Sequence, residues 1–550
     1  MDRRGVAVGA QPTVGRGGRT LIAVVPTVFL GYFFLYPLIS ILTTSFTTDG
    51  SLDLSAFGDV LTRPTLRGTA FFTIWQATVS TLLTVLAGLP AAYVFARFRF
   101  RGRSLFRAAV TIPFVLPTVV VGTAFLALIG PNGALGVDLS RTIWAILAAH
   151  VFYNYAIVVR TVGTLWEQLD PRLEEAARAL GASRWQTFKE VSLPLLRPAI
   201  AAASSLVFLF TFTSFGVILI LGGLEFRTLE VEIWRQTTSF LNLDVAAALA
   251  VLQLVGVAGI LVAYARYQQR RAIEQPLKPP GLTARAPTTL TERGLVAATL
   301  GGTAVLLGAP IAVLVGRSFR TPVGWGLDHY GSLAEGGASA LFVTPTEAIS
   351  NSLAFGTVAT VLAVTVGLMA AAVVAYRKGR LSRGFDTFLM LPLGTSAVTI
   401  GFGFLIALDQ PIDLRASAWL IPIAHALVAI PLVVRTAVPV MRSVQTRLRE
   451  AAAVLGASPA QAWREVDLPL IGRAAAVGAG FALAVSLGEF GATSFIVRPD
   501  SPTLPIAIFR LLSQPGAANF GQAMAMSTFL VILTGAAILI IDRYRVGSEF

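Results

Sequence analysis

Cysteine is absent from the 550-residue sequence, and histidine occurs only three times. Without cysteine the chain can form no disulfide, no thiolate metal site and no cysteine nucleophile. Charged residues are also scarce: they make up 13% of the chain, about half of the roughly 25% found in soluble domains. A chain of this length with so little charge cannot be a set of ordinary water-soluble domains. No P-loop or other nucleotide-binding motif occurs, so we expect the chain itself to bind no nucleotide.

Apolar residues are abundant instead, at 55% of the chain, with a mean hydropathy of +0.72. A spanning helix needs about 20 mostly apolar residues, and twelve stretches qualify. In the first half they cover roughly 21–44, 70–96, 108–130, 142–160, 198–221 and 245–265. In the second half they cover roughly 295–316, 348–376, 385–408, 418–441, 474–497 and 523–541. We therefore expect an all-α membrane protein with twelve transmembrane helices.

Acidic residues are outnumbered, 29 against 43 basic ones, which gives a net charge of +14. Alternate loops divide the basic residues unevenly: 33 lie on the side of the N-terminus and 10 on the opposite side. Membrane proteins keep Lys and Arg on the cytoplasmic side. This distribution predicts that both termini are cytoplasmic, and it explains the basic excess by topology rather than by nucleic-acid binding.

The sequence repeats itself at half its length. The passages that begin at Arg160 and Arg435 align without a gap at an offset of 275 residues. Six expected spans in each half make these parallel repeats, related by an axis along the membrane normal. We predict a cytoplasmic tail (1–20), a first repeat (21–267) with a matched loop (160–198), a cytoplasmic linker (268–294), and a second repeat (295–545) with a matched loop (435–473).

The matched loops carry strong local signals. Asp170 can cap a helix that has Pro171 at its first position, and Gly181 can end that helix in a left-handed turn. Ser183 followed three residues later by Gln186 is a capping box that starts a second helix. The second passage has the same box. We expect a helix, a Gly-Ala-Ser turn and a second helix between the fourth and fifth spans of each half.

In both loops a Glu-Ala-Ala run is followed by a glycine six residues after the glutamate, and a Leu-Pro pair ends the pattern. The residues are Glu175, Ala176, Ala177 and Gly181 in the first copy and Glu450, Ala451, Ala452 and Gly456 in the second. This pattern resembles the EAA loop of ABC-importer permeases, with valine (Val191 and Val466) where isoleucine is commoner. The resemblance implies the type I ABC-importer permease fold. A pair of amphipathic helices lying on the membrane surface is the alternative, but it does not explain the duplicated spacing.

In that family the loop docks on a cytoplasmic ATPase, so the resemblance implies that Glu175 and Glu450 bond the ATPase and that Gly181 and Gly456 shape the turn. The implied partners are two copies of the ATPase, an extracytoplasmic solute-binding protein and membrane lipid. The chain would bind no metal or cofactor, because ATP and Mg²⁺ act through the ATPase. The implied location is the bacterial cytoplasmic (inner) membrane.

Two fused halves resemble the thiamine and ferric-iron permeases, and the segments AHVFYN (149–154) and SLGEFGATSFI (486–496) resemble the thiamine branch. Thiamine is therefore the first candidate substrate and ferric iron the second, ahead of sulfate-type oxyanions or a phosphonate. A twelve-span secondary transporter is the rival of another class, but its Gly-rich Asp-Arg loop motif is missing from 96–107. A membrane-embedded enzyme would need clustered catalytic groups that the sequence lacks.

Few polar residues fall inside the expected spans. Glu489 is the only carboxylate there, and an intramembrane carboxylate either serves function or is bonded to a neighbouring helix. Its repeat counterpart is Ser214. The candidate translocation pathway consists of Ser214, Phe215, Glu489, Phe490 and Asn154. For His150 and His425, which are equivalent and have no nearby carboxylate in the sequence, helix–helix hydrogen bonding is favoured over metal binding.

Overall fold

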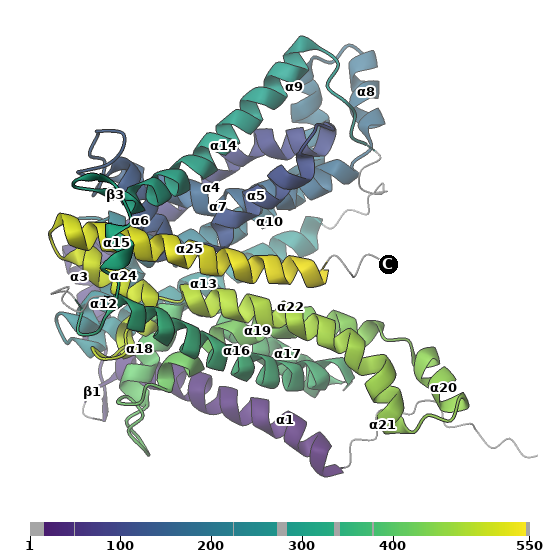
Figure 1. Ribbon diagram of the computed structural model, residues 1–550. Helices are drawn as coiled ribbons and strands as arrows, with labels where there is room; N and C mark the ends of the chain where they lie inside the picture. Colours follow the sequence, from purple (N-terminus) through teal and green to yellow (C-terminus); the bar gives the residue numbers. More distant parts are fainter. Residues whose placement is uncertain are drawn as a thin grey trace, which may run out of the picture. The chain divides into compact units, whose positions relative to one another are not determined.

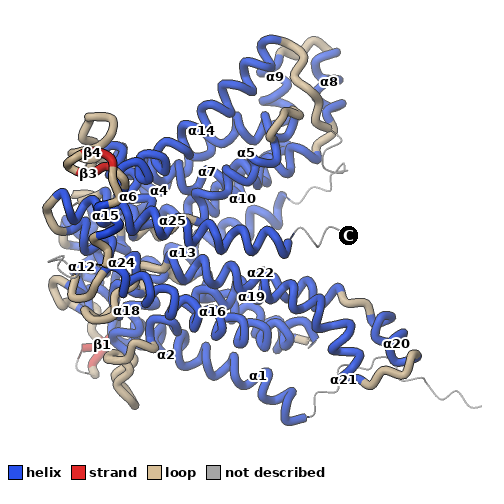
Figure 2. Tube along the Cα trace, in the orientation of Figure 1, coloured by secondary structure: helices blue, strands red, loops and turns tan. Residues whose placement is uncertain are grey.

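The computed structural model describes residues 16–48, 50–223, 225–271, 283–334, 341–376 and 379–545. In these residues helix is the dominant secondary structure, and each strand is only two residues long (Figures 1 and 2). The expected all-α class is therefore confirmed.

The elements follow in chain order, with η marking a π-helical turn. Those of the first half are α1 (Arg16–Leu30), η1 (Gly31–Leu35), α2 (Tyr36–Phe46), β1 (Thr47–Thr48), β2 (Ser51–Leu52), α3 (Ser55–Thr62), α4 (Pro64–Arg97), α5 (Arg103–Val115), α6 (Thr118–Ile129), α7 (Ile143–Gln168), α8 (Pro171–Ala179), α9 (Arg184–Thr187), η2 (Phe188–Ser192), α10 (Leu193–Phe212), α11 (Gly216–Leu221), α12 (Leu229–Thr238) and α13 (Leu243–Arg271).

Those of the second half are α14 (Leu290–Ser318), β3 (Arg320–Thr321), β4 (Gly324–Trp325), α15 (Asp328–Gly331), α16 (Pro345–Tyr376), α17 (Arg380–Gly394), α18 (Ala397–Ala407), α19 (Leu420–Ser443), α20 (Thr446–Val454), α21 (Pro459–Ala462), η3 (Trp463–Asp467), α22 (Leu468–Gly488), α23 (Thr493–Ile496), α24 (Leu504–Ser513) and α25 (Ala517–Arg545). The strands pair antiparallel, β1 with β2 and β3 with β4. Each hairpin follows the first span of its repeat.

Ten helical stretches in the described part of the chain are long and apolar enough to cross a membrane. Two further spans expected from the sequence, 108–130 and 385–408, are each a pair of helices. Helices α5 and α6 meet at 102°, and α17 meets α18 at 94°. The expected number of twelve holds if each bent pair counts as one span, and the bends themselves were not expected from the sequence.

Each bend has a local cause. Helix α5 stops where Leu116 precedes Pro117, because proline has no N–H and disfavours the helical conformation of the residue before it. The ψ of Leu116 is accordingly 140°. In the second repeat Pro392 stays inside α17, and the break comes about one turn later, where the Ser396 hydroxyl caps α18 by accepting the N–H of Val398 at 3.0 Å.

The chain folds into two compact units that do not coincide with the sequence repeats. Unit 1 contains 1–40, 347–504 and 532–550, and unit 2 contains 41–346 and 505–531. Helix α1 and η1 thus belong with the core of the second repeat, where Phe33 lies 6.3 Å from Phe404 between ring centroids. Helix α14 belongs with the core of the first repeat, where the Thr303 and Tyr155 hydroxyls are 2.8 Å apart. The first span of each repeat is therefore exchanged.

The fourth span of each repeat packs closely against the second. A Cβ placed on Gly88 of α4 would lie 2.7 Å from a methyl group of Val158 in α7, and one on Gly367 of α16 would lie 2.9 Å from Val433 in α19. Small residues let membrane helices approach in this way. Val158 and Val433 are repeat equivalents, whereas the two glycines differ by one helical turn. The two repeats therefore make the same helix–helix contact with glycines that lie one helical turn apart.

Candidate functional site: the duplicated loops

Both matched loops form the predicted helix, turn and second helix. In the first, the Asp170 carboxylate caps α8 by accepting the N–H of Arg172 at 3.0 Å, and Pro171 is the first helical residue. Figure 1 shows α8 at one end of the long helices of unit 2, and α20 likewise at one end of those of unit 1. The loops are therefore extensions of the spans that flank them.

The turn has the predicted left-handed glycine in each copy, with φ of +91° at Gly181 and +88° at Gly456. The capping box is also confirmed. The backbone N–H of Gln186 donates to the Ser183 hydroxyl at 3.2 Å, and the backbone N–H of Ser183 donates to the side-chain oxygen Oε1 of Gln186 at 2.8 Å. The second copy has the same pair of bonds at 3.3 and 2.8 Å.

Gly181→Ala is expected to destabilise the first loop locally by about 1–2 kcal/mol, because a Cβ in the left-handed region approaches its own backbone. No other atom lies within 4 Å of that Cβ position, so backbone strain is the whole cost. Amide hydrogen exchange of α8 and the turn should become about 5- to 30-fold faster. The control is Gly472→Ala, a helical position with equally open surroundings. Equal exchange rates in Gly181→Ala and the unmutated protein would contradict the strained turn.

The second helix of each loop is not a separate element. Residues 184–212 form one 29-residue helical stretch through η2, and residues 459–488 form one of 30 residues through η3. The π-helical turn adds a residue to the helix without breaking it. The expected arrangement of two short helices before the fifth span is thus corrected: the loop's second helix is the beginning of that span.

The tip of each loop is exposed. Glu175, Ala176, Glu450 and Ala451 lie on the surface, whereas Ala177 and Ala452 are half-buried. Leucines that come just before the turn glycines are almost fully exposed, at 90% for Leu180 and 88% for Leu455. Exposed apolar groups beside carboxylates are typical of a protein-binding surface.

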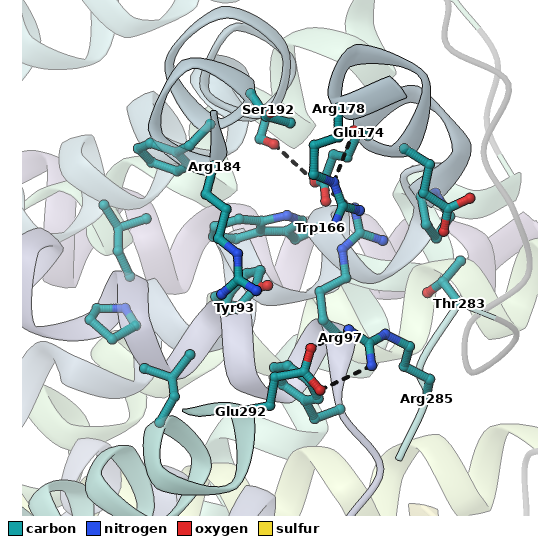
Figure 3. Close-up of a pocket in the computed structure, with 18 of the residues that line it drawn as sticks. Tyr93, Arg97, Trp166, Glu174, Arg178, Arg184, Ser192, Thr283, Arg285 and Glu292 are labelled. Carbon is teal, nitrogen blue, oxygen red and sulfur yellow. Dashed lines mark hydrogen bonds and ion pairs between the residues drawn. The ribbon is translucent and has the colours of Figure 1, made fainter. Parts of the chain in front are cut away.

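The first loop is anchored by a residue that the sequence analysis did not single out. Glu174, next to Glu175, accepts a bond from the Arg97 guanidinium at 2.8 Å and another from the Ser192 hydroxyl at 2.9 Å (Figure 3). Arg97 also donates to the carbonyl of Leu169 at 3.0 Å. These bonds join α8 to the end of α4 and to the start of α10.

The second loop makes the equivalent contact with different residue types, an arginine and an aspartate in place of a glutamate and a serine. At the offset of 275, Glu174 corresponds to Arg449 and Ser192 to Asp467. The Arg449 guanidinium forms a bidentate pair with the buried Asp467 carboxylate and lies over the Tyr376 ring at 5.9 Å. The hydrogen bonds that Arg449 donates to Asp467 raise the pKa of Arg449. In the sequence, only the alignment of the two repeats could have revealed that these two positions form a pair in each loop.

Part of the linker is ordered against the first loop. Arg285 pairs with the chain next to α4, since its N–H donates to the carbonyl of Arg97 at 3.0 Å and its carbonyl accepts from Arg99 at 2.8 Å. Its guanidinium bonds the carboxylate of Glu292 in the first turn of α14, which raises the pKa of Arg285. Residues 272–282 of the predicted linker (268–294) lie outside the described residues.

Both histidines join helices by hydrogen bonds, as favoured from the sequence. The His150 ring nitrogens lie 3.0 Å from Ser80 and 2.9 Å from Ser214, and those of His425 lie 2.7 Å from Ser486 and 2.8 Å from Thr493. In the described residues no group of three or more His, Asp or Glu could hold a metal ion. The expected lack of a carboxylate neighbour was wrong for His425.

That neighbour is Glu489, whose position also differs from expectation. It follows the last residue of α22 rather than lying inside a span. Its buried carboxylate accepts the N–H of Ala492 at 2.8 Å and of Thr493 at 3.0 Å, bonds the Thr493 hydroxyl, and lies 3.3 Å from His425. The side chain therefore bonds the turn that follows α22, and the role of Glu489 in the pathway stays a prediction.

The other proposed pathway residues are buried as well. Ser214, Phe215 and Phe490 are between 3 and 8% exposed, and Asn154 is 1% exposed. Asn154 donates to the carbonyl of His150 at 3.0 Å. Their role in the pathway stays a prediction.

Two further carboxylates are buried although they fall between the expected spans 198–221 and 245–265. Glu230 and Glu232 lie in α12 and are 0 and 3% exposed. Gln253 of α13 donates to Glu230, and Gln236 donates to Glu232 at 2.6 Å. The polar Gln253 inside an apolar span was the one sequence signal that a buried polar partner exists. The tertiary structure was needed to identify that partner as Glu230.

A cavity of about 1140 Å³ lies beside the first loop and is lined by the anchor residues Arg97 and Glu174 (Figure 3). A smaller one of about 600 Å³ lies beside the second loop and is lined by Arg449. None of the five proposed pathway residues lies in the wall of either cavity.

Comparison with known proteins identifies the family. The sequence matches the family described as "Binding-protein-dependent transport system inner membrane component" at residues 84–272 and 363–545. A probable ABC transporter permease protein of Sinorhizobium fredii (y4fN) is 25% identical over 546 residues, 94% of each chain. The thiamine transport system permease protein ThiP of Brucella suis is 30% identical over 490 residues, covering 86% of this chain and 87% of that one. The sulfate transport system permease protein CysT of Escherichia coli is 34% identical over 216 residues, covering 38% and 78%.

The secondary-transporter alternative is thereby overturned. Each of the two matched segments contains one duplicated loop, which confirms the resemblance seen in the sequence. The chain belongs to the family of inner membrane components of binding-protein-dependent transport systems, and it is an ABC-importer permease with two such repeats fused in one polypeptide.

Proposed function

We propose that this permease passes a small solute inward by alternating access, driven by two copies of a separate cytoplasmic ATPase docked on the loops around Glu175 and Glu450. The observation that carries the proposal is the unbroken path from each loop into a membrane helix, through 184–212 and 459–488. A displacement of the second helix of a loop moves the fifth span of that repeat directly, because the two are one helical stretch. ATP hydrolysis can therefore move the spans without any nucleotide site in this chain.

The partners follow from the same arrangement. The exposed Glu175 and Glu450, beside the apolar Leu180 and Leu455, offer the ATPase both a charge and an apolar contact. ATP and Mg²⁺ belong to that subunit, and this chain binds no cofactor. An extracytoplasmic solute-binding protein delivers the solute at the opposite face, and both termini are cytoplasmic.

Thiamine is the substrate we favour. The match to a thiamine permease covers 86% of this chain, both repeats included, whereas the match to a sulfate permease covers 38%. Ferric iron stays the second candidate, followed by sulfate-type oxyanions and a phosphonate. The substrate assignment rests on this likeness and on the resemblance of residues 486–496.

The double substitution Glu175→Arg with Glu450→Arg is expected to abolish co-purification of the ATPase with the permease. Reversing both exposed charges removes the hydrogen-bond acceptors and repels the cations that faced them, and truncating interface charge pairs costs about 2–5 kcal/mol or more each. The measurement is the ATPase-to-permease ratio after affinity purification from membranes.

The matched control is Glu190→Arg with Glu465→Arg. These two carboxylates are also exposed and are related by the same offset, but they lie in the π-helical turns η2 and η3. The control should retain the ATPase. An unchanged ratio in the Glu175/Glu450 variant would overturn the coupling-loop assignment.

The substrate is tested through the partner that captures it. Thermal unfolding of the cognate solute-binding protein is measured with thiamine, Fe(III) and sulfate, since a ligand that binds only the folded state raises the transition temperature. We expect thiamine alone to raise it. A rise with Fe(III) or sulfate and none with thiamine would reverse the order of substrates and leave the permease function intact.

A further inference from the structure

The cavity beside the first loop is enclosed by five segments of unit 2 that are far apart in the sequence. They are the end of α4, the end of α7, the loop helices α8 and α9, the linker around Arg285, and the first turns of α14. Figure 3 shows Arg97 and Arg184 reaching toward the middle of this space, with Trp166 and Tyr93 behind them. The cavity is thus a mixed surface of arginines and aromatic rings.

Its arginines are not all neutralised. Arg97 is paired with Glu174, and Arg285 with Glu292. The other three arginines in the wall, Arg172, Arg178 and Arg184, form no ion pair in the described residues, although Arg178 donates to the carbonyl of Glu174 at 3.2 Å. Two carboxylates remain in the wall: Asp170, which caps α8, and the exposed Glu175. The unpaired charge in the wall is therefore positive.

The wall also contains buried donors without acceptors. Arg97 Nε, Trp166 Nε1 and Thr187 Oγ1 have no hydrogen-bond partner in the described part of the chain, and the three residues are 7, 3 and 5% exposed. The two nitrogens can only donate. A buried donor left unsatisfied costs about 1–3 kcal/mol, so these three residues are a poorly satisfied part of the wall.

The side of the cavity formed by the spans is apolar. Leu86 and Leu89 of α4 and Leu295 of α14 line it, and Leu86 and Leu295 are 57 and 40% exposed. Both helices are candidate membrane spans, so these leucines continue into a surface that hydrocarbon can cover. A free anion would leave this part of the wall unused.

We propose that the cavity binds the headgroup of an anionic phospholipid. Arg178 and Arg184 contact the phosphate, and the acyl chains lie along Leu86, Leu89 and Leu295. Basic pockets between membrane helices at the cytoplasmic side bind anionic headgroups in this way. The site goes beyond the proposed transport function, and only its placement in the cytoplasmic leaflet rests on that function.

The second repeat does not reproduce the site. At the offset of 275, Arg97, Trp166, Arg178 and Arg184 are replaced by Ala372, Met441, Ala453 and Pro459. The smaller cavity there has no linker segment in its wall. We therefore expect a single lipid of this kind per chain, bound at the first loop.

The test is native mass spectrometry of the full-length permease, purified with its ATPase, stripped of lipid and titrated with phosphatidylglycerol or phosphatidylcholine. We expect phosphatidylglycerol to bind at a single site and phosphatidylcholine to bind far more weakly. Arg178→Gln with Arg184→Gln should weaken phosphatidylglycerol binding about 30-fold, at about fivefold for each basic residue lost. The control, Arg447→Gln with Arg464→Gln, removes two exposed arginines of the second loop and should bind as the unmutated protein does.

Equal binding of the two lipids by the unmutated protein would overturn the proposal whether or not the variant folds. Equal phosphatidylglycerol binding by all three proteins would also overturn it. A titration with inorganic phosphate distinguishes the sources: displacement of the lipid at millimolar phosphate would assign the cavity to a free anion instead. The ATPase is weighed in the same spectra, so an unmutated permease that carries its ATPase but does not prefer phosphatidylglycerol refutes the lipid site and leaves the proposed transport function intact.

Discussion

Glu489→Leu is expected to lower the free energy of unfolding by at least about 3 kcal/mol. The substitution leaves the N–H groups of Ala492 and Thr493 buried without an acceptor, and each such loss costs about 1–3 kcal/mol. It also removes the contact at 3.3 Å with His425. The measurement is unfolding of the purified permease, followed by tryptophan fluorescence during heating and in a denaturant series.

Glu465→Leu is the control, because that carboxylate is exposed and makes no such turn. The free energy of unfolding of Glu489→Gln should fall between those of Glu489→Leu and Glu465→Leu. One side-chain oxygen remains to accept a hydrogen bond, while the amide nitrogen faces the N–H of Thr493. The opposite result is informative: a Glu489→Leu protein of unchanged stability that no longer transports would assign Glu489 to the solute pathway instead.

Arg449→Glu is expected to have an effect of similar size on the second loop. The new carboxylate would lie beside Asp467, whose side chain is 2% exposed and would lose its only ion-pair partner in the described residues. Removing one member of a buried pair costs about 3–5 kcal/mol. We expect faster hydrogen exchange in α20 and loss of the co-purifying ATPase.

Adding Asp467→Ser to Arg449→Glu should restore most of what the single substitution loses, because Glu174 and Ser192 form this pair in the first loop at 2.9 Å. The reciprocal double substitution in the first loop, Glu174→Arg with Ser192→Asp, should restore a smaller part of what Glu174→Arg alone loses. There Arg97 stays in place and would meet a second guanidinium. Equal rescue in both loops would show that Arg97 is not part of the anchor.

The helices and turns of the two loops could be predicted from the sequence because their signals are local. Asp170, Gly181 and the Ser183–Gln186 box act on backbone groups at most a few residues away. The conformations they favour do not depend on the rest of the fold. The duplicated spacing then identified the surface that we propose for the ATPase.

The anchors of the loops could not be predicted, because each joins residues far apart in the chain. Arg97 and Glu174 are separated by 77 residues, and the sequence alone shows them only as two of many charges near the ends of spans. The same holds for Glu230 with Gln253, and for Glu489 with His425. The bonding partner of each residue, and therefore its structural role, is known only from the packing of the helices.

The sequence by itself determined that the chain lies in a membrane, that it has two parallel repeats, and that each repeat contains one duplicated loop, since hydropathy, charge distribution and capping are properties of short segments. The tertiary structure decided which first span joins which core, where the spans near Pro117 and Ser396 bend, and which linker residues line the cavity beside the first loop. Both repeats have the same apolar periodicity, so hydropathy cannot distinguish one core from the other. Side-chain packing between distant helices makes that choice.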